Sequence, residues 1–256
     1  MAAFALARAL RAGDTVYSSW CFLAAPIVAE TIARAGFTAV VIDQQHGLWD
    51  TAAVVAAVSA IHHAGATPVV RVPVGDNASV SRALDFGAEA IIAPMINTVA
   101  DARAFAAAAK FPPQGERSYG PFRAMALQGG TASIEYLREA NEGTLTLAMI
   151  ETQTALGNVE AIAATPGIDA LFIGPYDLST ALSGGKAQDV SAPEVERAID
   201  KIRDAALKAG KVPGIYCTDA ERAREMAKRG FRFMTIGNDL GLLRDGATAQ
   251  MKIVRS

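Results

Sequence analysis

Cysteine is nearly absent from this chain of 256 residues, which holds only Cys21 and Cys217, far apart in the sequence. The pair lacks metal-ligand spacing, and so little cysteine leads us to expect a protein of the reducing cytoplasm. No surplus of one charge is present either, since 24 lysines and arginines face 26 aspartates and glutamates, for a net charge of -2. Without a basic surplus, the chain lacks the signature of a nucleic-acid-binding protein.

Long apolar runs are missing as well. No stretch approaches the roughly 18 uninterrupted apolar residues that a membrane-spanning helix needs. The opening segment, MAAFALARALRAG, could be mistaken for a signal peptide, but Arg8 and Arg11 interrupt its apolar part. We therefore expect a short amphipathic helix there and no association with a membrane.

What the chain does have is a regular alternation of short β-rich runs and alanine-rich helical stretches. Apolar residues make up 51% and charged residues 20%, a composition typical of a globular protein with a large core. The β-rich runs are almost continuously apolar, as parallel strands are when helices cover them. The expected strands are Thr15–Ser19, Ala39–Asp43, Pro68–Arg71, Ala90–Pro94, Leu145–Glu151, Ala170–Gly174, Val212–Tyr216 and Phe233–Gly237.

Helical stretches follow these runs, and the last is a tail helix after Gly237. The others are expected at Pro26–Ala35, Thr51–Ala64, Ala78–Phe86, Val99–Lys110, Thr154–Ala163, Ala192–Ala209 and Ala220–Lys228. Strand-helix units in this number and length predict an α/β fold, a (β/α)8 TIM barrel that occupies residues 1–256 as a single domain. A doubly wound sheet is the alternative, but no GxGxxG motif follows a strand. Lys110–Gly143 and Asp177–Ser191 are expected to be long loops, functional or mobile.

Polar residues stand where several of the predicted strands end. They are Ser18 and Trp20, Asp43 and His46, Arg71, Pro94, Glu151, Gly174 and Asp177. In a TIM barrel the carboxyl ends of the strands meet at one rim, which carries the active site. The sequence therefore predicts that these residues gather there.

Glu151 and Asp177 end consecutive strands, so their carboxylates could share one cation. Two carboxylates, together with water and an oxygen-rich substrate, suit a hard ion such as Mg²⁺ or Mn²⁺. The alternative is that each carboxylate caps the helix that follows it.

Arg71 and His46 are the other candidates on this rim. A guanidinium at the end of a buried strand could clamp a carboxylate or stabilise an enolate, or it could form an ion pair with Glu151 or Asp43. His46 could carry a proton, oriented by Asp43 or Asp85. Trp20 could line an aldehyde pocket together with Phe122–Arg123 and a neighbouring subunit, or it could pack beneath a loop.

Lysine is absent from the strand ends. The lysines are Lys110, Lys186, Lys201, Lys208, Lys211, Lys228 and Lys252. An aldolase that works through an imine needs a lysine inside the site. Only Lys186, in a predicted loop, could reach it, so Schiff-base chemistry is disfavoured.

Several segments resemble the HpcH/HpaI family of class II, metal-dependent pyruvate aldolases, whose members include 4-hydroxy-2-oxoheptanedioate aldolase and 2-keto-3-deoxy-sugar-acid aldolases. The segments are PIVAETIARAGFTAVVIDQQHG, VVRVPVGDNASVSRALDFGAEAIIAPMINTVADA, FPPQGERSYG, MIETQTALGNVEAIAATPGIDALFIGPYDLS, GKVPGI and FMTIGNDLGLL. The resemblance covers nearly the whole chain. It implies reversible cleavage of a 4-hydroxy-2-oxo acid to pyruvate, or hydroxypyruvate, and an aldehyde, with a divalent ion (Mg²⁺, Mn²⁺ or Co²⁺).

The resemblance also implies roles for individual residues. His46 matches the proton acceptor, and Asp85 matches the acidic residue that raises its basicity. Arg71 matches the group that stabilises the transition state, while Glu151 and Asp177 match the metal ligands. The amides at Tyr176 and Asp177, after Gly174, match those that bind the carboxylate of pyruvate. Family members are typically homohexamers, trimers of dimers, which suggests a homo-oligomer here with an exchanged C-terminal helix.

Two positions depart from the family pattern. Gln45 stands where many members have glutamate, and Met149 stands where a substrate-contacting glutamine is common. Two other readings of the same site stay open. One is a different metal-enolate reaction, on an acyl-CoA or on phosphoenolpyruvate, and the other is a non-catalytic barrel that binds 2-oxo acids.

Overall fold

The apolar runs of the sequence form the strands of a closed barrel, in which each strand pairs in parallel with the next and β8 pairs with β1. This computed structural model describes residues 3–129 and 133–255. Within them the strands are β1 (Val16–Cys21), β2 (Ala39–Asp43), β3 (Thr67–Arg71), β4 (Ala90–Ala93), β5 (Leu145–Ile150), β6 (Ala170–Ile173), β7 (Val212–Cys217) and β8 (Phe233–Asn238). The TIM-barrel prediction is confirmed.

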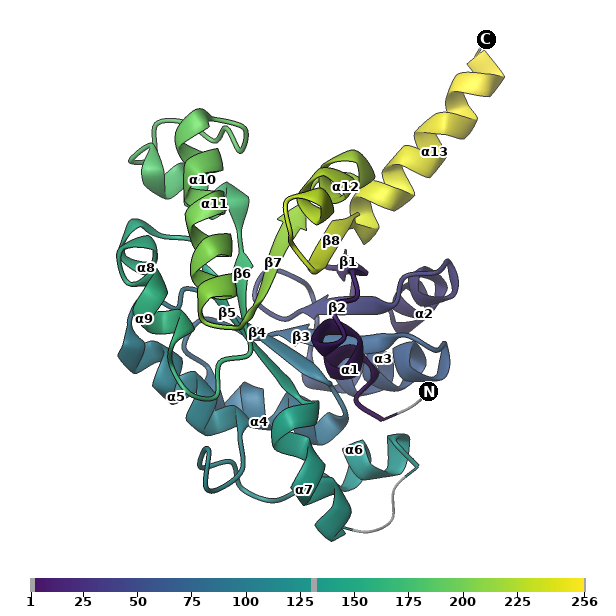
Figure 1. Cartoon of the computed structure of the whole chain (residues 1–256). Coiled ribbons are helices and arrows are strands. Elements are labelled where there is room, and N and C mark those ends of the chain that lie inside the picture. Colours follow the sequence, from purple (N-terminus) through teal and green to yellow (C-terminus); the bar gives the residue numbers. More distant parts are fainter. Residues whose placement is uncertain (1–2, 130–132, 256) are drawn as a thin grey trace.

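Helices cover the outside of the barrel (Figure 1). In the described residues they are α1 (Ala5–Arg11), α2 (Pro26–Arg34), α3 (Thr51–His63), α4 (Asn77–Phe86), α5 (Val99–Ala109), α6 (Phe122–Leu127), α7 (Ser133–Gly143), α8 (Gln153–Gly157), α9 (Val159–Ala163), α10 (Pro175–Leu182), α11 (Pro193–Lys208), α12 (Ala220–Lys228) and α13 (Asp239–Arg255). None of these helices has the length and apolar character needed to span a bilayer.

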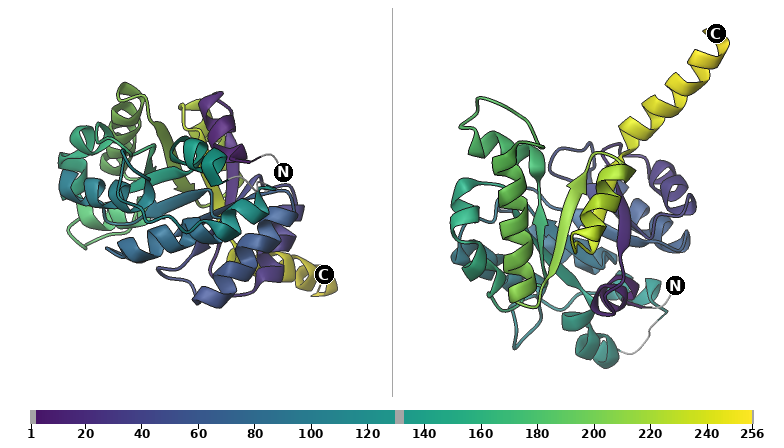
Figure 2. Two further views of the ribbon diagram at one scale, coloured as in Figure 1. Left: turned by 90° about the horizontal axis from the view of Figure 1, so that it is seen from below. Right: turned by 45° about the horizontal axis from the view of Figure 1, so that its top comes forward.

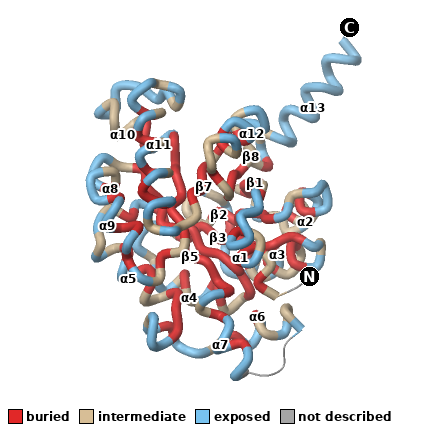
Figure 3. The backbone as a smooth tube through the Cα atoms, viewed as in Figure 1, coloured by how far each residue is buried: buried red, intermediate tan, exposed pale blue. Residues whose placement is uncertain are grey.

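The strands separate two layers of apolar core, which Figure 3 shows as buried backbone at the centre of the molecule. In β2, Val40 and Ile42 pack between the sheet and the helices, whereas Ala39 and Val41 face the barrel interior. Both faces of each strand are therefore buried, which explains the continuous apolar runs.

The amino-terminal helix α1 closes the end of the barrel at which the strands begin, which is called the lower end below. Its Leu6, Ala7 and Leu10 are buried in the interior cluster, so the amphipathic helix expected for this segment is present. At the other terminus, α13 projects away from the barrel in every view (Figures 1 and 2). Apolar side chains of α13, such as Leu243, Ile253 and Val254, are exposed.

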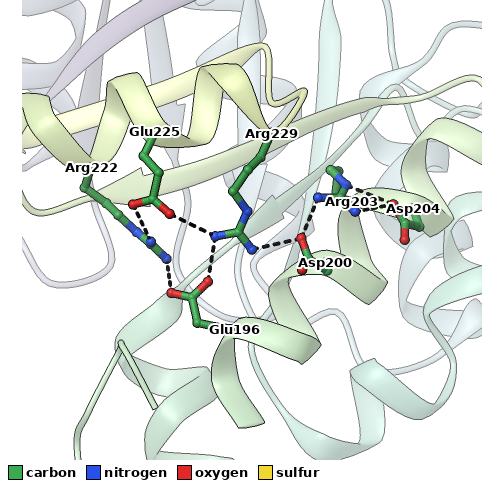
Figure 4. Close-up of polar contacts among 7 residues, drawn as sticks. All are labelled: Glu196, Asp200, Arg203, Asp204, Arg222, Glu225 and Arg229. Carbon is green, nitrogen blue, oxygen red and sulfur yellow. Dashed lines mark hydrogen bonds and ion pairs between the residues drawn. The ribbon is translucent and has the colours of Figure 1, made fainter. Parts of the chain in front are cut away.

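Ion pairs join α11 and α12 on the outside of the barrel (Figure 4). Glu196 accepts hydrogen bonds from Arg222 and Arg229. Asp200 pairs with Arg229 at 2.8 Å and with Arg203 at 2.5 Å. These side chains are partly exposed, unlike the charged groups inside the barrel.

Several predicted boundaries are wrong. Trp20 lies within β1 rather than after it, and the segment that begins at Asp177 continues helix α10 as far as Leu182. The insertion at Lys110–Gly143 contains α6 and α7. The helix expected at Thr154–Ala163 is divided at Asn158 into α8 and α9. In each case the competing signal was local, such as Pro175 at a helix start.

Candidate active site

Asp43 and Arg71 form a buried pair where β2 and β3 end. The two residues lie opposite each other in the strand register. Arg71 donates from Nε to Oδ1 of Asp43 at 2.8 Å and from Nη2 to Oδ2 at 2.5 Å. Of the two partners considered for Arg71, Asp43 is the one observed. This two-point contact fixes the plane of the guanidinium and leaves Nη1 without an acceptor among the described residues.

Trp20 supports this pair from β1. Its indole N–H donates to Oδ2 of Asp43 at 3.0 Å, and the guanidinium carbon of Arg71 lies 4.7 Å from the centre of its ring. Trp20 therefore occupies the barrel interior rather than the underside of a loop. The indole N–H, which is the only donor of the Trp20 side chain, is bound to Asp43. Trp20 therefore offers a ligand an apolar surface.

Glu151 follows β5 and is almost completely buried. Its Oε1 accepts the N–H of Met95 at 2.8 Å. Met95 has a left-handed backbone, with φ of 55°, which is uncommon outside glycine and turns this N–H towards the carboxylate. The helix start that Glu151 was considered to cap is capped instead by Thr152.

Glu151 also lies beside the start of α10. A Cβ at Gly174 would stand 2.6 Å from its Oε2, so any larger residue there would require the Glu151 carboxylate to shift. Burial, with a smaller contribution from the charge of the neighbouring Asp177, raises the pKa of the Glu151 carboxyl to about 7. Two carboxylates that repel each other in this way are suited to share a cation.

The first turn of α10 exposes backbone donors at the same place. Pro175 is the first residue of the helix, and no side chain caps its start. The N–H groups of Tyr176 and Asp177 cannot bond within the helix, because they belong to its first turn. They form a site suited to a carboxylate.

His46 lies in the loop after β2. Its backbone N–H donates to Oδ1 of Asp43 at 3.3 Å, and its side chain is exposed at the edge of the cavity. Asp43 thus holds the loop that carries His46 as well as the side chain of Arg71. Its carboxylate positions both candidate reacting groups.

A cavity of about 330 Å³ brings these elements together. Its lining residues are Trp20, Phe22, His46, Arg71, Met149, Gly174, Pro175, Tyr176, Asp177, Tyr216 and Asn238. No lysine belongs to this set, which agrees with the argument against Schiff-base chemistry. Phe122 and Arg123 do not line this cavity, so their place in an aldehyde pocket that includes a neighbouring subunit stays a prediction.

Sequence analysis missed Phe22, Met95, Tyr216 and Asn238. Met95 acts through its backbone, and no side-chain pattern marks such a donor. Phe22 is held by Asp239, which accepts its N–H at 3.1 Å where the neighbouring strands β1 and β8 end. Tyr216 could have been found, because it stands at the expected end of the seventh strand.

Asp85 is not among the gathered residues. It lies near the end of α4, which runs back from the rim towards the lower end of the barrel, where Glu89 precedes β4. Its carboxylate binds Arg117 at 2.6 Å. No hydrogen bond or ion pair within residues 3–129 and 133–255 joins Asp85 to His46, so the role predicted for Asp85 stays a prediction.

The two departures from the family pattern have different surroundings. Met149 faces the cavity, and its methyl group packs against Gly174. Gln45 keeps its side-chain oxygen buried, with no donor from the described part of the chain. Both cysteines are free and buried, and burial raises their pKa, to about 12 for Cys217. Neither thiol is therefore a ready nucleophile.

A closed parallel barrel with charged groups gathered at one mouth is the architecture of a TIM-barrel enzyme. The HpcH/HpaI aldolase/citrate lyase family model matches residues 17–246. The chain is 41% identical to a hydroxypyruvate/pyruvate aldolase of Rhizorhabdus wittichii over 90% of both chains. It is 36% identical to a 5-keto-4-deoxy-D-glucarate aldolase of Klebsiella pneumoniae, over 92% of this chain and 91% of that one.

Among solved structures, the chain is similar to an HpcH/HpaI aldolase/citrate lyase family protein from Burkholderia cenocepacia. The TM-score is 0.89 at 34% identity, and the match covers 98% of this chain and 99% of that one. The chain belongs to the HpcH/HpaI aldolase/citrate lyase family. Like the aldolases that it resembles, it is an enzyme of the lyase class.

Proposed function

We propose that this enzyme is a divalent-cation-dependent aldolase that reversibly cleaves 4-hydroxy-2-oxo acids to pyruvate, or hydroxypyruvate, and an aldehyde. The observation that carries the proposal is the proximity of Glu151 to Asp177 and Gly174, beside the cavity that Asp177, Gly174 and Arg71 line. The same reaction is supported by the names of two relatives, a hydroxypyruvate/pyruvate aldolase at 41% identity and a 5-keto-4-deoxy-D-glucarate aldolase at 36%.

Glu151 and Asp177 are the residues that would hold the cation. No group of three or more histidine, cysteine, aspartate or glutamate residues in the described ranges could do so. Two carboxylates leave positions for substrate oxygens, which suits Mg²⁺, Mn²⁺ or Co²⁺. When bound, the cation supplies Lewis-acid polarisation of the 2-oxo group.

The chain's own residues supply binding, charge and proton transfer. The N–H groups of Tyr176 and Asp177 bind the carboxylate of the keto acid. Nη1 of Arg71 faces the negative charge that develops on the 2-oxo oxygen. His46 removes the proton of the C4 hydroxyl as the C3–C4 bond breaks. The electron pair of that bond remains on the pyruvate fragment as an enolate, and the other fragment leaves as an aldehyde.

The position of Asp85 bears on the oligomeric state. If Asp85 raises the basicity of His46, it does so from a second copy, because within one chain it lies near the other end of the barrel. We therefore propose a homo-oligomer, a hexamer built as a trimer of dimers, in which α13 is exchanged and Asp85 of the partner subunit approaches His46. The exposed apolar side chains of α13 support such an exchange.

Mixing two inactive variants tests this arrangement. His46→Ala and Asp85→Ala proteins, dissociated and reassembled together, should recover part of the wild-type activity, because some mixed sites then contain both residues. Recovery would not occur if each site were complete within one chain. Sedimentation of the wild-type protein measures the number of copies.

Removal of the cation tests the reaction itself. Protein treated with EDTA should lose retro-aldol activity on a 4-hydroxy-2-oxo acid and regain it with Mn²⁺. Full activity without the ion would contradict the proposal. Turnover of acyl-CoA or phosphoenolpyruvate instead would identify another enolate reaction. Pyruvate binding without deuterium exchange into its methyl group would identify a binding protein.

A further inference from the structure

One side of the cavity is not used by the reaction described above. The carboxylates, Arg71 and His46 come from β2, β3, β5 and β6. The wall on β7 and β8, which lies between β6 and β1, contributes Tyr216 and Asn238 to the lining. Since the keto acid occupies the carboxylate side, the aldehyde fragment meets this wall.

Tyr216 is held in one place by rings and by strand register. Ile215 pairs with Ile173, so Tyr216 lies level with Gly174, where α10 and the carboxylates begin. Its ring packs edge-on against Trp20, with 5.7 Å between the ring centres. Trp20 in turn contacts Arg71. The phenol therefore stands one ring away from the guanidinium that faces the reacting atoms.

Asn238 determines which way the hydroxyl of Tyr216 points. Oδ1 of Asn238 accepts the N–H of Gly241 at 2.9 Å, which leaves its amide nitrogen to donate to the Tyr216 oxygen at 3.1 Å. The phenol oxygen is thus an acceptor in this contact, and its own hydrogen is free. No acceptor for it exists among the described residues. Burial raises the pKa of Tyr216, so the hydroxyl stays protonated.

The rest of this wall is mainly apolar. Phe22, Trp20 and Pro175 line it, and the only N–H of the Trp20 side chain is already bound by Asp43. A single oriented donor in an apolar wall is the usual means by which a pocket distinguishes a hydroxylated ligand from its alkyl counterpart.

We propose that Tyr216, oriented by Asn238, is the specificity-determining residue for the aldehyde and that it selects aldehydes with a hydroxyl near the carbonyl. The inference rests on the proposed function, since it concerns the second substrate of that reaction. The hydroxyl of the aldehyde accepts the hydrogen of the phenol. An alkyl group at that position would leave the phenol donor buried without a partner, which is unfavourable.

Glycolaldehyde and propanal form a matched pair of substrates, because they have the same number of heavy atoms and differ in a hydroxyl against a methyl. The measurement is the ratio of their kcat/KM values in aldol addition to pyruvate. In Tyr216→Phe, which keeps the ring, this ratio should fall about tenfold, as expected for one lost hydrogen bond. The kcat/KM for propanal should rise, because phenylalanine leaves no donor unpaired beside the methyl group. Deuterium exchange into pyruvate needs no aldehyde and should continue.

Asn238→Asp tests the orientation separately. The aspartate can still accept the N–H of Gly241, but its other oxygen would now accept the hydrogen of Tyr216 and turn it away from the cavity. The glycolaldehyde preference should therefore fall although the phenol is intact. Tyr17→Phe is the matched control, since Tyr17 packs against the outer core cluster, away from the cavity, and its ratio should equal that of the wild type.

Two outcomes would overturn the inference in distinguishable ways. A wild-type enzyme that exchanges deuterium into pyruvate but shows the same ratio as Tyr216→Phe refutes the role of Tyr216 and leaves the proposed function intact. A wild-type enzyme that neither exchanges deuterium nor forms an aldol with the cation present refutes both.

Discussion

The two ends of the barrel contain the same kinds of buried charged group. At the carboxyl rim, Arg71 pairs with Asp43, and Glu151 is buried beside them. At the lower end, Lys110 pairs with Asp169 at 2.7 Å. Glu89 is buried there beneath α1. Burial raises the pKa of both glutamates to about 7.

Most bonding groups at the lower end have partners within the fold, although Oε1 of Glu89 is buried without a hydrogen-bond partner among the described residues. The ammonium of Lys110 donates to the carbonyls of Asn141 and Thr144 and to Asp169, which accounts for its three hydrogens. Glu89 faces the first backbone amides of α1. This end therefore ties the insertion and the amino-terminal helix to the barrel.

The groups at the rim retain bonding capacity. Nη1 of Arg71 has no acceptor in the described ranges, and Glu151 lies beside a second carboxylate next to a cavity. The comparison teaches that a raised pKa by itself does not mark an active site. The neighbouring carboxylate, the free donors and the cavity distinguish Glu151 from Glu89.

The largest contrast should appear when each glutamate is changed to glutamine. Glu151→Gln should weaken Mn²⁺ binding by more than about 100-fold, because removal of a ligand exceeds the effect of outer-shell changes. Retro-aldol activity should fall with it. Glu89→Gln is the matched control and should bind the ion like the wild type. Calorimetric titration measures both, and equal affinities would remove the distinction between the two ends.

Substitution of the two buried cationic side chains, Arg71 and Lys110, should affect catalysis in one case and stability in the other. Arg71→Lys keeps a charge beside Asp43 but loses the two-point contact and Nη1, so kcat should fall by about 100-fold. Lys110→Met leaves the partly buried Asp169 without its cationic partner and should lower the free energy of unfolding by about 3 kcal/mol. The kcat of its folded fraction should not change. Steady-state kinetics and urea unfolding test the two, and a change in KM alone for Arg71→Lys would make it a binding residue.

The ionisation of Glu89 should make the free energy of unfolding depend on pH. Its pKa is about 7 in the folded protein against an ordinary value of 4.5, so the folded state holds the extra proton between these values. Stability from this group is full below about pH 4.5 and is lost as the pH rises through about 7, by roughly 3 kcal/mol. Glu89→Gln should remove this loss.

Urea unfolding of metal-free protein between pH 5 and 8.5 measures this effect. Glu151 should contribute a similar loss in the absence of the ion, so the wild type should fall further than either single variant. Added Mn²⁺ should offset the Glu151 part and leave the Glu89 part unchanged. A profile for Glu89→Gln that parallels the wild type would show that Glu89 is not the titrating group.

The smallest effect is expected from the outer ion pairs between α11 and α12. Arg229→Met removes contacts to Glu196 and Asp200, but these side chains are partly exposed and screened. The loss in the free energy of unfolding should be about 1 kcal/mol or less, and it should shrink further at high salt. A loss as large as that of Lys110→Met would mean that exposed and buried pairs here do not differ.

Some features of the site followed directly from the sequence. Asp43, Arg71 and Glu151 were placed at one rim because each directly ends, or follows, a continuous apolar run. The lower position of Asp85 was also readable, because it stands near the end of a helix that must run back from the rim.

The sequence by itself determined the barrel and the residues that its rim would carry, because strand and helix periods are set by neighbours only a few residues apart. Only the tertiary structure decided which of them pair. The choice of Asp43 for Arg71, the amide of Met95 for Glu151 and Asn238 for Tyr216 joins residues from different strands and loops. Such contacts depend on strand register and side-chain direction around a closed barrel, which no local pattern encodes.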